Sequence, residues 1–243
     1  MAVLLLLAGS GIRMRPKGAA AKGEVTGMLE IIYGTGNGAK ISYMEEALKN
    51  LPVKIVGLHQ AAESEGISLP EIKETGTNPL ENARLKAEGY FRLFGKPVFS
   101  CDSGIYLWNY TTGEPLPDGE QPGIHIRGDG GRRLDDEELL AYYIGLVKKY
   151  GRVCGRFKNG ICIIWNEQLK KESMSESMWG EPFLLTDRPH ERRVEGFPVD
   201  SISLDIATGK YIYDLEKDTE GEEAQYSGFE NFFRQCLGEW KLL

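Results

Sequence analysis

Residues 29–58 contain a strand, a glycine-rich turn, a helix and a second strand, and this order constrains the fold more than any other feature of the chain. LEIIY (29–33) is short and apolar, as buried strands are, and GTGNG (34–38) supplies the turn. Apolar residues recur at helical spacing in AKISYMEEALKN (39–50), and VKIVGL (53–58) is the next strand. A strand–helix–strand unit of this length predicts a parallel strand pair joined by a crossover.

A capped amphipathic helix is predicted within ETGTNPLENARLKAEGYFRLFG (74–95). Asn78 is a candidate N-cap, Pro79 suits the first helical position, and Glu81 stands where a capping box places its acid. One apolar stripe follows at helical spacing, made of Leu80, Ala83, Ala87, Phe91 and Phe94. Gly95 is the expected stop.

The remaining elements are predicted from the same periodicities. PVFSC (97–101) is expected to be a strand, with Asp102-Ser103-Gly104 just past its end. A helix with an acidic start and a basic end is expected at 135–151. Residues 152–186 are β-rich, with strands at ICIIW and SMSESMW, and a last amphipathic helix covers 227–240. The pattern predicts an α/β fold with a long mixed sheet flanked by helices.

Composition excludes some partners. The net charge of -7 disfavours nucleic acid polymers, which reward a basic face. The four cysteines form no CxxC pair, so we expect reduced thiols in a cytoplasmic protein. Residues 1–27 contain an apolar run, VLLLL, that is too short to span a membrane. We interpret 1–27 as an extension outside the functional domain, 28–243, although an extra strand or a targeting segment are alternatives.

Two segments carry candidate chemistry. GTGNGAK (34–40) brings backbone amides together ahead of a helix, which suits a phosphate, and Lys40 adds a positive charge. The alternative is a plain turn in which Asn37 caps the helix. Glu74 and Asp102 are placed near the ends of predicted elements, and two carboxylates with phosphate oxygens suit Mg²⁺. Each could equally be a solvated turn residue.

Other charged residues have weaker signals. Lys86 lies on the predicted helix and is otherwise a surface lysine, and Arg127 lies in a glycine-rich loop where it could simply be solvated. The three histidines, His59, His125 and His190, show no metal-ligand spacing, and we assign them no role.

Five motifs occur in a shared order, and together they resemble the inosine triphosphate pyrophosphatase family, the Ham1-like enzymes that hydrolyse non-standard purine nucleoside triphosphates. They are TGNGAK (35–40), ETGTNPLENARLKA (74–87), SCDSG (100–104), QPGIHIRGDGG (121–131) and GFPVD (196–200). They are similar to the family's T-G-N-x-x-K, E-x-G-x-[TS]-F-x-E-N-A-x-x-K-A, D-D-S-G, P-G-x-x-S-A-R-Y and G-F-G-Y-D segments. The resemblance implies two lobes with a nucleotide cleft between them, and a homodimer.

The resemblance also implies roles for matching residues. The triphosphate would be bound by Thr35, Asn37, Lys40, Lys86 and Ser103. Glu74 and Asp102 would hold Mg²⁺, and Asp102 would also activate the attacking water. Phe197 would lie against the base, and Asp200 would order that pocket.

The chain departs from the family pattern in three places. Cys101 replaces the first Asp of D-D-S-G, and Pro198-Val199 replaces Gly-Tyr. The family's late S-H-R motif, which reads the purine, is absent, and EEAQYSGFENFF (222–233) stands near its expected position. The phosphate and metal end therefore matches the family, whereas the base end does not.

The function that the resemblance implies is Mg²⁺-dependent hydrolysis of non-standard purine nucleoside triphosphates. Cleavage between the α- and β-phosphates would give a monophosphate and pyrophosphate. Two alternatives remain: a non-catalytic nucleotide-binding protein on the same fold, and a phosphatase of another phosphorylated metabolite. The presence of Asp102 favours an enzyme over a non-catalytic protein. Release of pyrophosphate rather than orthophosphate would distinguish the pyrophosphatase from the phosphatase. We expect no membrane partner.

Overall fold

The computed structural model describes residues 27–128, 133–215 and 219–243. The proposed extension, 1–27, therefore lies outside the described residues except for Gly27. Met28 is exposed, and regular structure begins directly after it.

The parallel unit predicted at the start of the fold is confirmed. β1 (Leu29–Tyr33) pairs in parallel with β2 (Val53–Gly57). The helix that joins them, α1 (Gly38–Ala47), ends three residues earlier than predicted. A short helix that the sequence analysis missed, α2 (Leu58–Glu65), follows β2 and ends at Gly66, whose φ of 64° suits glycine.

A long antiparallel ribbon forms the centre of the sheet. β3 (Val98–Asn109) pairs with β4 (Val153–Ile164) along its whole length, from Val98↔Ile164 to Asn109↔Val153. The prediction that the strand ends at residue 101 is wrong, because the pairing with β4 continues for eight more residues. Asp102 therefore lies inside a strand. The end of β1 pairs in parallel with the start of β3, through Ile32↔Val98 and Tyr33↔Phe99.

The remaining strands extend this ribbon. β6 (Phe183–Leu185) pairs with β4, and β7 (Ser203–Asp205) pairs with β6. β5 (Lys170–Ser173) pairs with the other end of β4. In the described chain the seven strands have the order β2-β1-β3-β4-β6-β7, with β5 beside β4, which is the mixed sheet expected. The predicted strand SMSESMW is instead a turn with a 3-10 helix, η3 (Glu176–Met178).

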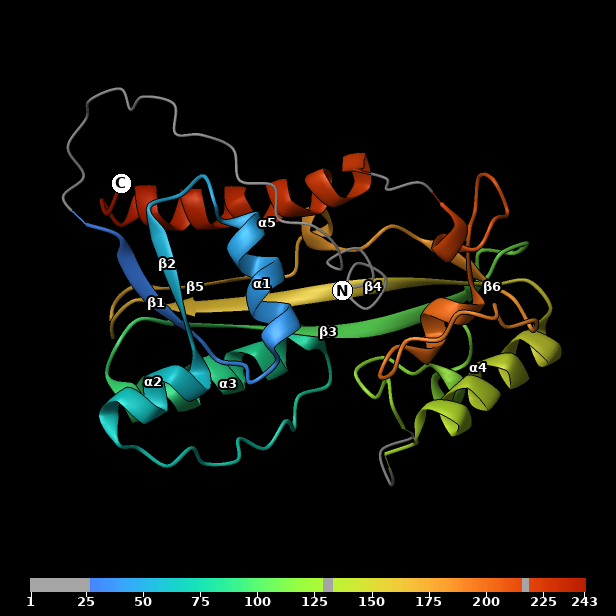
Figure 1. Ribbon diagram of the computed structural model, residues 1–243, viewed down its shortest axis with the longest axis horizontal. Helices are drawn as coiled ribbons and strands as arrows, with labels where there is room; N and C mark the ends of the chain where they lie inside the picture. Colours follow the sequence, from blue (N-terminus) through green and yellow to red (C-terminus); the bar gives the residue numbers. More distant parts are fainter. Residues whose placement is uncertain (1–26, 129–132, 216–218) are drawn as a thin grey trace.

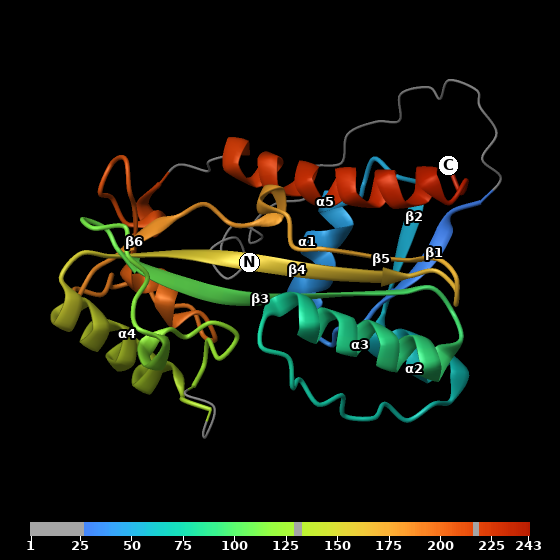
Figure 2. The ribbon, with the colours of Figure 1, turned by 180° about the vertical axis from the view of Figure 1, so that it is seen from behind.

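Side-chain alternation along the strands divides the core into two layers. Ile31 faces a core formed with α1 and α5 (Thr219–Glu239), whereas Ile32 faces α2 and α3 (Pro79–Phe94). On β4, Ile161 and Ile163 join the α5 side, and Cys162 joins α3. Figures 1 and 2 show α5 on one side of the sheet and α3 on the other.

The far end of the ribbon has its own helix and core. α4 (Asp136–Tyr150) packs there with η4 (Pro198–Ile202) and the second half of β3 (Figure 1). The short 3-10 helices η2 (Asp118–Glu120) and η5 (Ile212–Asp214) lie in loops. No helix among the described residues has the length and apolar character needed to cross a bilayer.

The helix caps follow the sequence closely. The Asn78 side chain accepts from the Glu81 N–H at 3.0 Å, as predicted. The Glu81 carboxylate accepts from Thr77 N–H at 2.6 Å, one residue ahead of the position that a capping box would use. At α4, Asp135 and Glu138 form a complete capping box.

Candidate active site

The glycine-rich loop between β1 and α1 is organised by Asn37. Its side-chain oxygen accepts from Ala39 N–H at 2.9 Å and from Lys40 N–H at 3.2 Å, and its own N–H donates to the Thr35 hydroxyl at 3.2 Å. Asn37 thus caps α1, as the plain-turn alternative predicts, and phosphate binding by this loop stays a prediction. Lys40 is half-buried and forms no ion pair with another residue that the structure describes.

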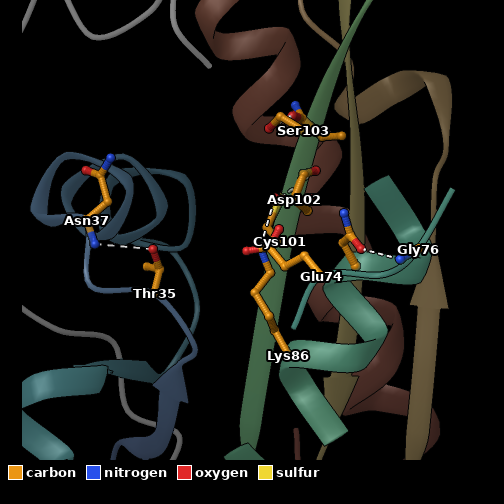
Figure 3. Close-up of polar contacts among 10 residues, drawn as sticks. Thr35, Asn37, Glu74, Gly76, Lys86, Cys101, Asp102 and Ser103 are labelled. Atoms are coloured by element: carbon orange, nitrogen blue, oxygen red, sulfur yellow. Dashed lines mark hydrogen bonds and ion pairs between the residues drawn. The ribbon is translucent and has the colours of Figure 1, made fainter. Parts of the chain in front are cut away.

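A lysine joins the two candidate acids. Lys86 Nζ lies 2.9 Å from Asp102 Oδ1 and 3.3 Å from Glu74 Oε2 (Figure 3). The side chains of Lys86 and Asp102 are only 14% and 13% exposed, whereas that of Glu74 is 47% exposed. The alternative that Lys86 is a plain surface lysine is wrong. The loop residues Thr35 and Asn37 lie across from this group in Figure 3.

The charge on Lys86 is held by its partners. Burial by itself would lower the pKa of Lys86, but the two carboxylates act in the opposite sense, Asp102 more than Glu74. Their combined effect raises the pKa of Lys86 above its ordinary value. Lys86 is therefore a fixed positive charge between two acids.

Helix α3 brings these groups together. Lys86 reaches Asp102 because α3 packs against the β3–β4 ribbon, where Gly160 allows the close approach: a Cβ there would lie 2.4 Å from Leu80 N. The buried Asn82 side chain accepts from Gly76 N–H at 2.8 Å and so ties the segment that carries Glu74 to α3. The sequence analysis missed Asn82, although the E-N-A of the long motif contained it.

Ser103 lies on the opposite face of β3 from Asp102, since successive strand residues alternate. Its hydroxyl donates to the Asn159 side-chain oxygen at 2.6 Å. The hydroxyl proton is thereby committed, and the oxygen offers only lone pairs to a ligand. Binding a phosphate oxygen would require Ser103 to give up this bond. Asn159 is fully buried and was not singled out in the sequence.

Cys101 is a buried thiol at the position where the resembling family has an acid. Burial raises its pKa to about 11, despite the opposing effect of Lys40 and Lys86. The thiol is thus uncharged at neutral pH and does not supply the negative charge that an acid would carry at this position. All four cysteines are free and buried.

The two residues expected at the base end behave differently. Phe197 is half-buried at the start of η4. Asp200 is fully buried, and neither carboxylate oxygen has a hydrogen-bond partner among the described residues. Burial raises the pKa of Asp200 to about 7. The nearby Tyr213 hydroxyl is also buried without a partner, and burial together with Asp200 raises its pKa to about 12.

Two side chains given weak roles have definite partners. Arg127 donates to the Gly196 carbonyl at 3.0 Å and pairs with Asp136, and it lowers the pKa of that acid. Arg127 therefore anchors the segment before Phe197 and is not simply solvated. His190 contacts Asp214 at 3.1 Å.

Comparison with known proteins assigns a family. Residues 31–202 match the model of the Ham1 family. A dITP/XTP pyrophosphatase of Streptococcus pyogenes serotype M1 is 40% identical over 195 residues, which are 79% of this chain and 54% of that protein. A dITP/XTP pyrophosphatase of Coxiella burnetii is 36% identical over 113 residues, 46% of this chain and 50% of that protein. The chain spans about half the length of these curated relatives.

Solved structures agree on the fold. A HAM1 protein from Coxiella burnetii superposes with a TM-score of 0.63 at 20% identity and covers 87% of this chain and 100% of its own. The Staphylococcus aureus Ham1 protein has a TM-score of 0.60 at 22% identity, covering 87% and 99%. These similarities establish the α/β architecture.

Proposed function

Because the chain belongs to the Ham1 family, we propose that it hydrolyses nucleoside triphosphates, of the non-standard purine class, to a monophosphate and pyrophosphate. The observation that carries this proposal is the contact of Lys86 with both Glu74 and Asp102, at 3.3 and 2.9 Å, beside a glycine-rich loop. Fixed charges of both signs next to an amide-rich turn suit a phosphoanhydride and its counter-ion.

The two carboxylates fit a divalent cation. The two carboxylates together need a positive charge nearby. Lys86 supplies one such charge, and a divalent cation would supply more. Among the described residues no three acidic, histidine or cysteine side chains converge, so protein ligands alone would not complete a site. Mg²⁺ matches this donor set, since it binds one or two carboxylates and takes its other ligands from water and phosphate. When bound, it would neutralise phosphate charge.

The chain's own residues would do the following. Lys86 binds Asp102 Oδ1, which leaves Oδ2 to accept a proton from a water positioned for in-line attack. Lys40 and Lys86 would offset negative charge as it builds on the phosphate oxygens. Thr35 and Asn37 would orient the triphosphate together with Lys40, and the half-buried Phe197 would contact the base.

The test is a substrate panel. The full chain is incubated with purine and pyrimidine nucleoside triphosphates and Mg²⁺, and both pyrophosphate and orthophosphate are measured. We expect pyrophosphate, and none in excess chelator. Orthophosphate alone would favour a phosphatase, and nucleotide binding without turnover would favour a non-catalytic protein. We also propose a cytoplasmic homodimer, which sedimentation and fractionation would test.

A further inference from the structure

A buried chain of hydrogen bonds runs from helix α1 to Ser103. The Tyr43 hydroxyl donates to the Gln225 side-chain oxygen at 2.6 Å, and Gln225 Nε2 donates to the Met178 carbonyl at 3.0 Å. That carbonyl also accepts from Asn159 Nδ2 at 2.6 Å, and Asn159 Oδ1 accepts from Ser103. Five elements are linked in this way: α1, α5, η3, β4 and β3.

The bonds fix the orientation of both amides. Rotating the Asn159 amide would turn its oxygen toward the Met178 carbonyl and its NH₂ away from it, leaving two acceptors in contact. Gln225 is constrained in the same manner, since its oxygen is needed by Tyr43. Asn159 and Gln225 are 0% and 3% exposed, so water cannot replace a lost partner cheaply.

The chain connects the two halves of the candidate site. Tyr43 lies on α1, whose first turn carries Asn37 and Lys40, and Ser103 is the neighbour of Asp102 on β3. β1 contacts β3 only up to Phe99, so strand pairing does not tie the loop to residues 102 and 103. The hydrogen-bond chain supplies this connection from the opposite face of the sheet.

We propose that Asn159 and Gln225 are positioning residues that hold the phosphate-side loop and the Asp102–Ser103 segment in register. The consequence for catalysis rests on the proposed function; the mechanical coupling does not. The same bonds exclude one other role for Gln225. Both ends of its amide are engaged inside the protein, so Gln225 does not read a nucleobase in place of the absent S-H-R motif.

The experiment uses two variants within the hydrogen-bond chain, Asn159→Leu and Tyr43→Phe, and one control. Asn159→Leu removes the Ser103 acceptor, and Tyr43→Phe removes the first donor. Tyr143→Phe is the matched control, because Tyr143 is a buried tyrosine on helix α4 whose hydroxyl donates to the Ile126 carbonyl, outside the hydrogen-bond chain. Hydrogen exchange is followed at the amides of α1, and kcat and KM are measured by pyrophosphate release.

We expect Asn159→Leu, a change on β4, to speed exchange in α1 while Tyr143→Phe does not. We expect Asn159→Leu and Tyr43→Phe each to lower kcat about tenfold, equivalent to about 1.4 kcal/mol, with a smaller change in KM. In the double variant, the fold reduction in kcat should be smaller than the product of the two single reductions, as it is for coupled residues. Unchanged α1 exchange in folded Asn159→Leu would overturn the proposal. If that variant does not fold, exchange at Ser103 and Asn159 in Tyr43→Phe decides by the same criterion. A wild-type chain that releases no pyrophosphate would refute the proposed function, while the exchange test still decides the coupling.

Discussion

Lys86 determines the electrostatics of the acidic pair at the scale of single residues. Without it, Asp102 and Glu74 would repel each other at the edge of the ribbon. With it, each acid has a cation within 3.3 Å, and the acids can be held close together. Under the proposed function, Lys86 would keep its bond to Asp102, and its remaining ammonium protons would be offered to phosphate oxygens.

Replacing Asp102 by Asn tests its role as a proton acceptor. The amide keeps the size of the side chain but loses its basicity. We expect kcat to fall by about 10²–10⁴-fold, the usual contribution of a general base. Substrate affinity should change little. Glu46→Gln, an exposed acid on α1 paired with Lys49, is the control and should keep full activity. Wild-type turnover in Asp102→Asn would remove this residue from the mechanism.

Asp200 predicts a pH dependence of stability. Burial raises its pKa to about 7, whereas an unfolded Asp titrates near 4. Between these values the folded state holds a proton that the unfolded chain has lost. Stability contributed by this group therefore falls as the pH rises from about 4 to 7, and stays at its lower level above 7. We expect Asp200→Asn to match the wild type near pH 4 and to exceed its melting temperature at pH 8.

Asp205 provides a control of opposite sign. Its bond to Thr208 lowers the pKa of Asp205, so Asp205→Asn should lose stability above pH 4. Melting temperatures at several pH values between 4 and 8 measure both effects. A constant gap between wild type and Asp200→Asn across this range would show that Asp200 does not titrate there.

At the scale of elements, the contact between α3 and β4 depends on Gly160. Its missing side chain allows the backbone of Pro79 and Leu80 to approach within what would be 2.4–2.7 Å of a Cβ. Gly160→Ala should push α3 away and destabilise the protein by about 1–3 kcal/mol, as overpacking does. Because Lys86 lies on α3, this shift should also move it away from Asp102, and activity should fall as well. The control is Gly145→Ala on α4, which has open space and should be neutral or stabilising. Equal unfolding free energies for both variants would contradict this view of the interface.

The elements also show how far sequence reasoning reaches. Caps and apolar periodicity located α3 and α4 almost to the residue, because both signals are local. The length of β3 was not predictable from its own residues, since CDSG resembles a turn and extends only because β4 pairs with it. SMSESMW alternates like a strand but lacks a partner in the sheet, and it forms η3 instead. Tertiary pairing decided both cases.

The whole molecule brings together what the sequence could name only in pieces. Glu74, Lys86 and Asp102 were each identifiable from motifs, and the fold places them in contact. Asn82 and Asn159 were not identified, and the sequence did not predict the structural role of Gln225, because a buried amide has no sequence signature until its partners are known. The hydrogen bonds that orient the site are therefore the part that required the structure.

Under the proposed function, base selectivity would depend on groups from several elements, including Phe197 and Asp200 at η4 and Tyr213 on η5. The S-H-R motif is absent, and two polar residues of α5 near its expected position, Gln225 and Arg234, have partners inside the protein. Gln225 is bonded to Tyr43 and Met178, and Arg234 pairs with Glu230 on the helix surface. Phe197 remains half-exposed, and stacking on an aromatic ring tolerates different bases.

We therefore expect weak discrimination among purine triphosphates. A site that hydrogen-bonds a substrate group rejects analogues strongly, because its own polar groups are then left unpaired. Among the described residues, the buried polar groups without partners include the Asp200 carboxylate and the Tyr213 hydroxyl. Because burial raises the pKa of Asp200 to about 7, its carboxyl is partly protonated at neutral pH and can donate or accept, so we expect hypoxanthine and adenine both to be accommodated. The measurement is kcat/KM for inosine, xanthosine, adenosine and guanosine triphosphates at pH 6 and pH 8. We expect the ratios of kcat/KM between these substrates to be well under a thousandfold, which is about 4 kcal/mol at 1.4 kcal/mol per decade. In Phe197→Leu, we expect kcat/KM to fall for every substrate by a larger factor than the ratios between substrates change. A thousandfold preference for inosine triphosphate would mean that other residues of the chain read the base.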